Sequence, residues 1–139
     1  VIADGEQIRR VIHNIISNAI KYMDKPKGII QIRIKDVGDF IQIEIEDNGK
    51  GMTPEDTRKY NDKEYILNGG GPGIGLVNSF TRLYMYYGKE ADWNVSSILS
   101  VGTVITLKIP VQENLFWTAY FYGVIMKWIV STGAFPVQT

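Results

Sequence analysis

Apolar residues recur at helical spacing from about residue 6 to residue 23. At about 100° per residue they fall on one stripe, which predicts an amphipathic helix that faces a core. The stripe consists of Ile8, Val11, Ile12, Ile15, Ala19 and Met23. Asn14, Asn18 and Lys21 follow the border of the stripe, with Tyr22 on its apolar side. Because asparagine is a poor residue for a helix interior, two of them one turn apart indicate either a solvated polar edge or a binding role.

Two segments then alternate apolar and polar residues, which is the pattern of half-buried strands. Residues 29–35 read IIQIRIK and residues 40–47 read FIQIEIED, with a turn between them. They predict an antiparallel hairpin whose isoleucines face inward, and continued alternation points Asp47 inward as well. A buried carboxylate needs donors. Asp47 is therefore either a turn aspartate that accepts from its own backbone or a residue that accepts from a ligand amino group.

The next stretch, EDNGKGMTPED at residues 46–56, combines glycines with a helix start. Asn-Gly after an alternating strand favours a tight hairpin turn. Thr53 as an N-cap, Pro54 at the first helical position and two acidic residues after it instead favour an open loop followed by a helix. We expect the second arrangement, in which Gly49 and Gly51 let a flat group approach the backbone.

A denser glycine stretch, NGGGPGIGLVN at residues 68–78, precedes a helix that we expect to end at Gly88. Backbone N–H groups at a helix start suit an anion such as phosphate. Glycine-rich loops are more often flexible connectors, and neither a dinucleotide-binding fingerprint nor a P-loop is present here. Residues 61–72 are expected to form a mobile polar lid.

Two further strands, at residues 92–97 and 103–110, complete the pattern. The order of elements predicts an α/β fold, a two-layer sandwich in which helices cover one face of a mixed, mainly antiparallel sheet. We expect this domain to span residues 1–110. Residues 111–139 form an atypical tail whose 16 residues at 115–130 are almost entirely apolar, short of the ~20 of a membrane span. The tail is interpreted as an interface for self-association or as sequence added for expression, in preference to an extra element packed on the domain.

Composition narrows the classes of partner. Fifteen basic and fifteen acidic residues leave no net charge to attract nucleic acid, and the absence of cysteine excludes disulfides and thiolate metal sites. The single histidine, His13, is expected to be structural. The chain opens in the lead-in to a helix without a signal-peptide pattern, so a fragment of a longer protein is expected.

Four stretches together resemble the N, G1, G2 and terminal boxes of the ATP-binding catalytic domain of sensor histidine kinases, in order and spacing. This Bergerat-type fold is shared with gyrase, Hsp90 and MutL. The stretches are NIISNAIKY (14–22), DNGKGM (47–52), GPGIGL (71–76) and SVGTVITLKIP (100–110). The resemblance covers roughly residues 4–110. The helix at 73–88 resembles the LytS/YesM-like branch and the asparagine helix the commoner branch, so the subfamily stays open.

The resemblance implies a site for ATP and Mg²⁺. Asn18 would bind the metal through its side-chain oxygen, Asn14 and Lys21 would face phosphate, Tyr22 would lie against the adenine, and Asp47 would accept from the adenine amino group, directly or through a water. The other residues expected at the nucleotide are Gly49, Gly51, Met52, Gly71, Gly73, Ile74, Gly75, Leu76 and Thr103. No residue of this chain is expected to be catalytic.

Position 14 separates the relatives by chemistry. The ATPases and the anti-sigma-factor serine kinases of this fold carry a glutamate general base there, and the amide of Asn14 cannot take a proton. A histidine kinase needs no such base, because a neutral histidine is already nucleophilic. The resemblance therefore implies transfer of the ATP γ-phosphoryl group to a histidine on a separate dimerisation domain of the same full-length protein.

The same resemblance implies a response regulator downstream and a cytoplasmic location in a membrane-anchored sensor. Without a phosphoacceptor histidine, this chain should bind Mg-ATP and not phosphorylate itself. Two alternatives remain: a nucleotide-dependent interaction module, and an anti-sigma-factor-like serine kinase.

Overall fold

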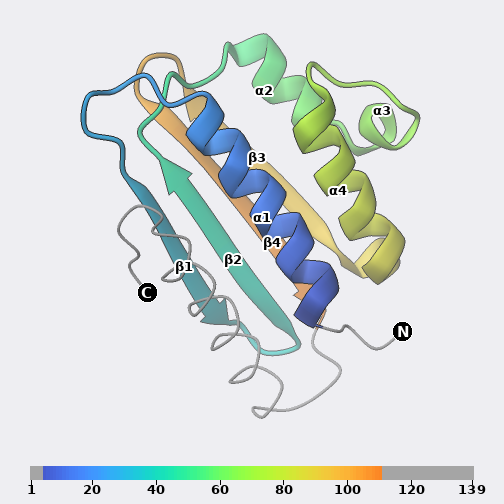
Figure 1. Ribbon diagram of the computed structural model, residues 1–139. Helices are drawn as coiled ribbons and strands as arrows, with labels where there is room; N and C mark the ends of the chain where they lie inside the picture. Colours follow the sequence, from blue (N-terminus) through green and yellow to red (C-terminus); the bar gives the residue numbers. More distant parts are fainter. Residues whose placement is uncertain (1–4, 111–139) are drawn as a thin grey trace.

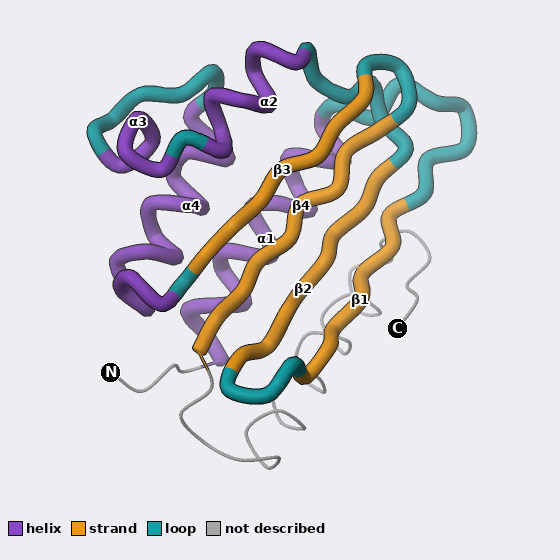
Figure 2. Tube along the Cα trace, turned by 180° about the vertical axis from the view of Figure 1, so that it is seen from behind, coloured by secondary structure: helices purple, strands orange, loops and turns teal. Residues whose placement is uncertain are grey.

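The computed structural model describes residues 5–110, which form two layers, with helices packed on one face of a single sheet (Figures 1 and 2). The strands lie in the order β1-β2-β4-β3. The elements are α1 (Gly5–Lys21), β1 (Ile30–Asp36), β2 (Phe40–Asp47), α2 (Pro54–Asn61), α3 (Lys63–Leu67), α4 (Ile74–Tyr87), a short 3-10 turn η1 (Gly88–Glu90), β3 (Asp92–Ile98) and β4 (Gly102–Pro110). The predictions for the tail lie outside the described residues.

The two-layer α/β fold is confirmed, and every strand pair in residues 5–110 is antiparallel rather than mixed. The reason is the chain path. The helical excursion α2–α4 returns through β3 at the edge, and the turn from β3 brings β4 back beside β2 in the opposite direction. This register places Asp47 opposite Ile30 on one side and Thr103 on the other.

The core forms between α1, α4 and the inward face of the sheet. The apolar stripe of α1 is buried as predicted from Ile8 to Ala19, whereas Met23 is only partly buried and follows the helix, which ends at Lys21. The inward isoleucines Ile41, Ile43 and Ile45 of β2 are 1% exposed or less. Phe80 of α4 stacks on Trp93 of β3 with ring centroids 5.0 Å apart and an interplanar angle of 1°. Phe80 is fully buried. The stack therefore packs α4 against the edge strand β3 inside the core.

The polar face of the sheet carries a ladder of cross-strand ion pairs. Arg33 of β1 donates to Glu44 and to Glu46 of β2, each at 2.8 Å. The hydrogen bond from the Arg33 guanidinium lowers the pKa of the half-buried Glu44 carboxyl. This face is thus stabilised by pairs of opposite charge, as expected for the solvated side of an antiparallel sheet.

The chain after β2 is an open loop followed by a helix, as predicted. Thr53 caps α2 by accepting from the N–H of Asp56 at 3.2 Å, and Pro54 is the first helical residue. Asn48 also explains why no tight hairpin turn forms at Asn-Gly. Its side chain accepts from the N–H of Ile29 at 2.8 Å and donates to the carbonyl of Lys27 at 3.1 Å, which ties the loop to the start of β1.

The segment predicted as a polar lid contains a helix that periodicity did not reveal. α3 occupies Lys63–Leu67, and the Asp62 carboxylate caps it by accepting from the N–H of Tyr65 at 3.1 Å. A helix of five residues is too short to show an apolar repeat. Its one buried residue, Ile66, anchors the segment to the core.

Candidate functional site

The predicted site residues come from segments that the fold brings together at one end of the sandwich. The end of α1, the end of β2 and the start of α4 lie at this end (Figure 1). Asn18 meets the second glycine stretch, since a β-carbon added to Gly75 would lie 3.2 Å from its side-chain oxygen. Gly49 likewise lies against the carbonyl of Tyr22. The border of α1 therefore contacts both glycine stretches.

Asp47 is half-buried where β2 ends. Its Oδ1 accepts from the N–H of Gly49 at 2.8 Å, so the turn-aspartate interpretation is correct for that oxygen. Burial raises the pKa of the Asp47 carboxyl above its ordinary 3.8, and hydrogen bonds from the backbone of Gly49 and Thr103 oppose the rise. A net rise indicates that these donors do not fully compensate the burial of the charge, which leaves a role for a ligand donor.

This raised pKa predicts the pH dependence of binding. A ligand amino group favours the ionised carboxylate. Affinity should therefore be highest at a pH above the pKa of Asp47 and fall as the pH drops through that pKa, which lies above the ordinary 3.8. In the free protein the sign is opposite: burial of the ionised group costs stability, and that cost disappears on acidification. Titration with adenosine, which carries no phosphate, would check the prediction, and an affinity that stays constant down to pH ~4 would contradict it.

Gly51 has a packing role of its own. Its φ is +71°, and a β-carbon there would lie 2.2 Å from the carbonyl oxygen of Ile98, the last residue of β3. The N–H of Ser100 donates to the carbonyl of Lys50 at 2.6 Å. Close approach of two backbone segments therefore requires glycine here, and space for a flat ligand remains a prediction.

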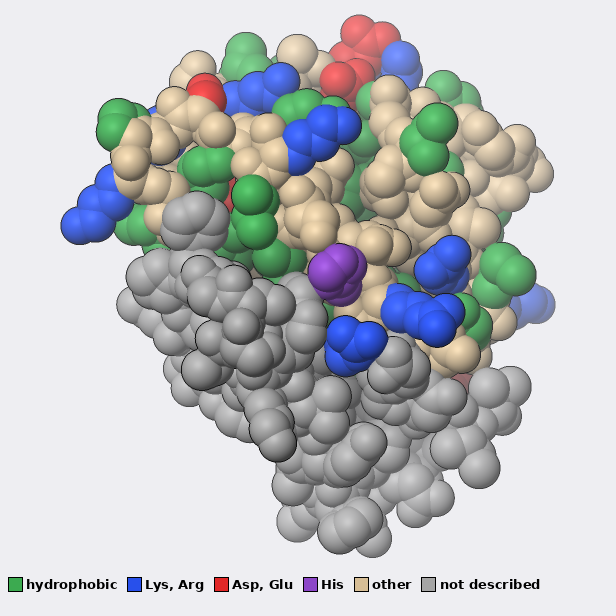
Figure 3. All heavy atoms as spheres, viewed as in Figure 1, with side chains coloured by type: hydrophobic (Ala, Val, Ile, Leu, Met, Phe, Trp, Pro, Cys, Tyr) green, Lys and Arg blue, Asp and Glu red, His purple; other side chains and the backbone are tan. Residues whose placement is uncertain are grey.

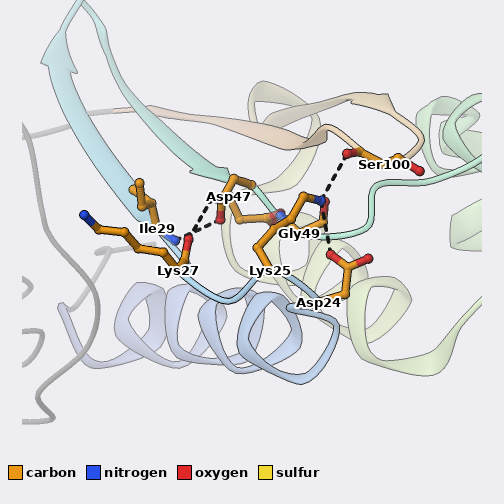
Figure 4. Close-up of polar contacts among 8 residues, drawn as sticks. Asp24, Lys25, Lys27, Ile29, Asp47, Gly49 and Ser100 are labelled. Atoms are coloured by element: carbon orange, nitrogen blue, oxygen red, sulfur yellow. Dashed lines mark hydrogen bonds and ion pairs between the residues drawn. The ribbon is translucent and has the colours of Figure 1, made fainter.

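Lys25 links the loop that contains Gly51 to two neighbouring loops, and the sequence alone did not indicate this role. Its ammonium donates to the carbonyls of Gly49 and Ser100, at 3.2 and 3.0 Å, and pairs with Asp24 (Figure 4). The loop after α1, the loop after β2 and the β3–β4 turn thus meet at one side chain. No periodicity or motif marks Lys25, because its partners are backbone carbonyls of distant segments.

The side chains predicted to lie around the adenine differ in their surroundings. Tyr22 is 42% exposed, and the ammonium of Lys50 lies 4.6 Å from its ring centroid. Met52 is tied down through its N–H, which donates to the Ser97 hydroxyl at 2.8 Å. That hydroxyl also pairs with the buried Thr103 hydroxyl at 2.8 Å. The ring of Tyr22 is therefore partly accessible to solvent, whereas the Thr103 side chain is buried and its hydroxyl is hydrogen-bonded to that of Ser97.

The second glycine stretch lies along a hollow of about 450 Å³. Gly71, Gly73 and Ile74 line it, and Gly71 has a φ of +129°. Ile74 is 78% exposed at the helix start, whereas Leu76 is buried beneath it. The first turn of α4 is thus anchored by Leu76 and leaves its outer surface open.

The polar residues predicted to face phosphate and metal lie on α1. Asn14 and Asn18 are half-buried and Lys21 is exposed. Within residues 5–110 no group of three or more histidine, cysteine or acidic side chains could hold a metal ion. The metal role of Asn18 stays a prediction. His13 is exposed on the helix-bearing face (Figure 3). None of the described helices is long and apolar enough to span a bilayer.

Comparison with known proteins gives concordant results. A family model described as histidine kinase-, DNA gyrase B- and HSP90-like ATPase matches residues 3–113. Sporulation kinase B of Bacillus subtilis (strain 168) is 31% identical over 110 residues, which cover 79% of this chain and 25% of that protein. The aerobic respiration control sensor protein ArcB of Escherichia coli (strain K12) is 34% identical over 116 residues, which cover 78% of this chain and 14% of ArcB. The chain therefore spans a quarter or less of the length of these relatives.

Solved structures show the same fold. The catalytic domain of histidine kinase ThkA superposes with a TM-score of 0.59 and 21% identity, covering 78% of this chain and 67% of that one. The mycobacterial sensor histidine kinase MprB gives a TM-score of 0.58 and 21% identity, covering 79% and 76%. At this identity the structures support the architecture alone.

Proposed function

The chain belongs to the histidine kinase-, DNA gyrase B- and HSP90-like ATPase family, as an ATP-binding catalytic domain of the sensor histidine kinase type, and on this premise we propose how its residues act. Residues 1–110 form the catalytic domain. It binds ATP with Mg²⁺ and delivers the γ-phosphoryl group to a histidine on a separate dimerisation domain of the same full-length protein.

The observation that carries the proposal is the meeting of Asn18 with Gly75 at the start of α4. A side-chain oxygen next to a helix start with open N–H groups suits a Mg²⁺–phosphate group, since the oxygen can bind the cation and the N–H groups the anion. Asp47 lies at the other end of the same site and would accept from the adenine amino group. Adenine and phosphate would thus be bound by separate parts of the fold.

The chain contributes binding and positioning rather than proton transfer. Asn14 cannot act as a general base, so activation of water or of a serine hydroxyl is disfavoured. Lys21 and Mg²⁺ would neutralise phosphate charge while the acceptor histidine attacks the γ-phosphorus and ADP leaves. A response regulator would then receive the phosphoryl group, and a membrane-anchored sensor with this domain in the cytoplasm would be the full-length protein.

The test combines binding and transfer. Calorimetric titration with a non-hydrolysable ATP analogue, with and without Mg²⁺, should show binding that depends on the metal. The chain, mixed with γ-labelled ATP and the histidine-bearing domain of the full-length protein, should produce acid-labile phosphohistidine. Replacing that histidine by glutamine should abolish the label.

The other outcomes select the alternatives. ATP binding without transfer to any side chain would favour a nucleotide-dependent interaction module. Acid-stable phosphoserine on a supplied protein would favour a serine kinase. No binding by the folded chain, nor by residues 1–111 alone, would contradict the proposal.

A further inference from the structure

The end of α2 is fixed to the outer edge of the sheet by its last two residues. The carbonyl of Tyr60 accepts from the indole N–H of Trp93 at 2.8 Å. The Asn61 side chain accepts from the N–H of Val95 at 2.7 Å and donates to the carbonyl of Val95 at 2.8 Å. Because β3 is an edge strand of the described sheet, Asn61 satisfies backbone groups that a further strand would otherwise pair. These hydrogen bonds to β3 thus hold the backbone of Tyr60 in place.

The ring of Tyr60 is fixed as firmly as its backbone. The residue is 7% exposed, and its ring packs edge-on against Phe80 with centroids 6.1 Å apart. Phe80 in turn stacks on Trp93. Since a packed ring has little rotational freedom, the direction of the Tyr60 hydroxyl is set by the core.

This hydroxyl lies at Gly73, the N-cap residue of α4. A β-carbon added to Gly73 would lie 3.1 Å from the hydroxyl oxygen. Burial raises the pKa of Tyr60, and a hydrogen bond from the backbone of Gly73 opposes the rise, so the phenol is neutral at physiological pH. Tyr60 therefore meets the glycine stretch from the core side.

Gly73 is also held by a backbone hydrogen bond: its carbonyl accepts from the N–H of Val77 at 3.4 Å. It is the N-cap of α4 in an extended conformation, with φ −148° and ψ 149°, and no side chain caps the helix. The N–H groups that follow it are the ones expected at phosphate. Their position depends on where Gly73 is held.

We propose that Tyr60 is a positioning residue for the triphosphate: its hydroxyl holds Gly73 from the core side and presets the first turn of α4 to receive phosphate. The inference rests on the proposed function. Neither the glycine pattern nor the helix periodicity indicates it, since Tyr60 and Gly73 are joined only by the fold. The resulting preorganisation reduces the ordering that the ligand must otherwise impose.

The first test is Tyr60→Phe, which keeps the packed ring and removes only the hydroxyl. In the nucleotide-free protein, the Gly73 amide should exchange its hydrogen ~5-fold faster by NMR. Affinity for a non-hydrolysable ATP analogue should fall ~5-fold, while affinity for adenosine stays unchanged. Tyr86→Phe is the matched control, because Tyr86 lies in the last turn of α4, at the end of the helix away from Gly73. It should change neither quantity.

A second test uses coupling between the two residues. Gly73→Ala places a methyl group against the hydroxyl and should weaken binding of the ATP analogue in the unaltered chain. In the Tyr60→Phe background the same change should weaken it less, because the opposing oxygen is absent. Strictly additive losses would overturn the inference.

The outcomes of these measurements distinguish this inference from the proposed function. Failure of the unaltered chain to bind the ATP analogue would contradict the function, while the exchange rate of Gly73 would still test the contact. Normal binding with no effect of Tyr60→Phe would overturn the inference alone. An equal loss for adenosine would also overturn it, because it would show general loosening rather than positioning of the phosphate end.

Discussion

Replacing Asp47 by asparagine is expected to lower the affinity of the chain for ATP by ~10- to 100-fold. The carboxylate already accepts from the N–H of Gly49 through one oxygen, so an asparagine that keeps this bond turns its NH₂ group toward the ligand. A donor would then face the adenine amino group, which is also a donor. The variant loses one hydrogen bond to the ligand and leaves a buried polar group unpaired. The loss of binding free energy should therefore be at the upper end for a single contact.

Calorimetric titration with a non-hydrolysable ATP analogue would measure this effect. Asp39→Asn is the control, because Asp39 is an exposed residue of the β1–β2 turn at the opposite end of the hairpin. The control should bind as the unaltered chain does. Thermal unfolding should also show that Asp47→Asn is folded, since removal of a buried charge relieves a desolvation cost. Undiminished affinity in a folded Asp47→Asn variant would disprove the role of Asp47.

Phe80→Ala is expected to lower the free energy of unfolding by ~3–5 kcal/mol. Phe80 is fully buried and contacts both Trp93 and Tyr60, so its removal leaves a cavity and breaks an aromatic stack. Both losses add to the lost transfer free energy of the ring. For a domain of this size, such a loss is a large share of the total stability.

Urea denaturation followed by tryptophan fluorescence would measure the change, with Trp93 as the reporter next to the cavity. Met85→Ala is the control on the same helix, because Met85 is 73% exposed, and it should alter stability by no more than ~0.5 kcal/mol. If Phe80→Ala does not fold, Phe80→Leu keeps enough volume to give a measurable intermediate loss. Equal stability of Phe80→Leu and the unaltered chain would contradict a packing role for the stack.

Local patterns were sufficient for the elements that are long or marked by special residues. The stripe of α1 and the alternation of β1 and β2 appear in the structure as predicted, because a helix or strand with one buried face must repeat its apolar residues. Thr53 and Pro54 revealed the start of α2, because a helix start needs a cap and tolerates proline. The inward Asp47 followed from the same alternation.

Other features depend on contacts that leave no local pattern. α3 is too short for an apolar repeat, and the sheet is antiparallel throughout residues 5–110 because of the path of the chain rather than any one strand. Gly51 is expected at the ligand, and the structure adds a packing reason for glycine there: a β-carbon would meet the carbonyl of Ile98, 47 residues further along the chain by the numbering. Backbone–backbone proximity of this kind is invisible in a sequence.

The sequence by itself determined the two-layer fold and the order of its strands along the chain, since these depend on spacing and residue type. The glycine and asparagine residues expected at the nucleotide came from the family resemblance of its motifs. The tertiary structure alone decided how they are held. Lys25 joins three loops, Asn61 completes the edge of β3 and Tyr60 lies at Gly73, and each contact joins segments far apart in the chain. Hydrogen bonds to backbone groups do not require one particular residue type in return, so only the folded chain reveals them.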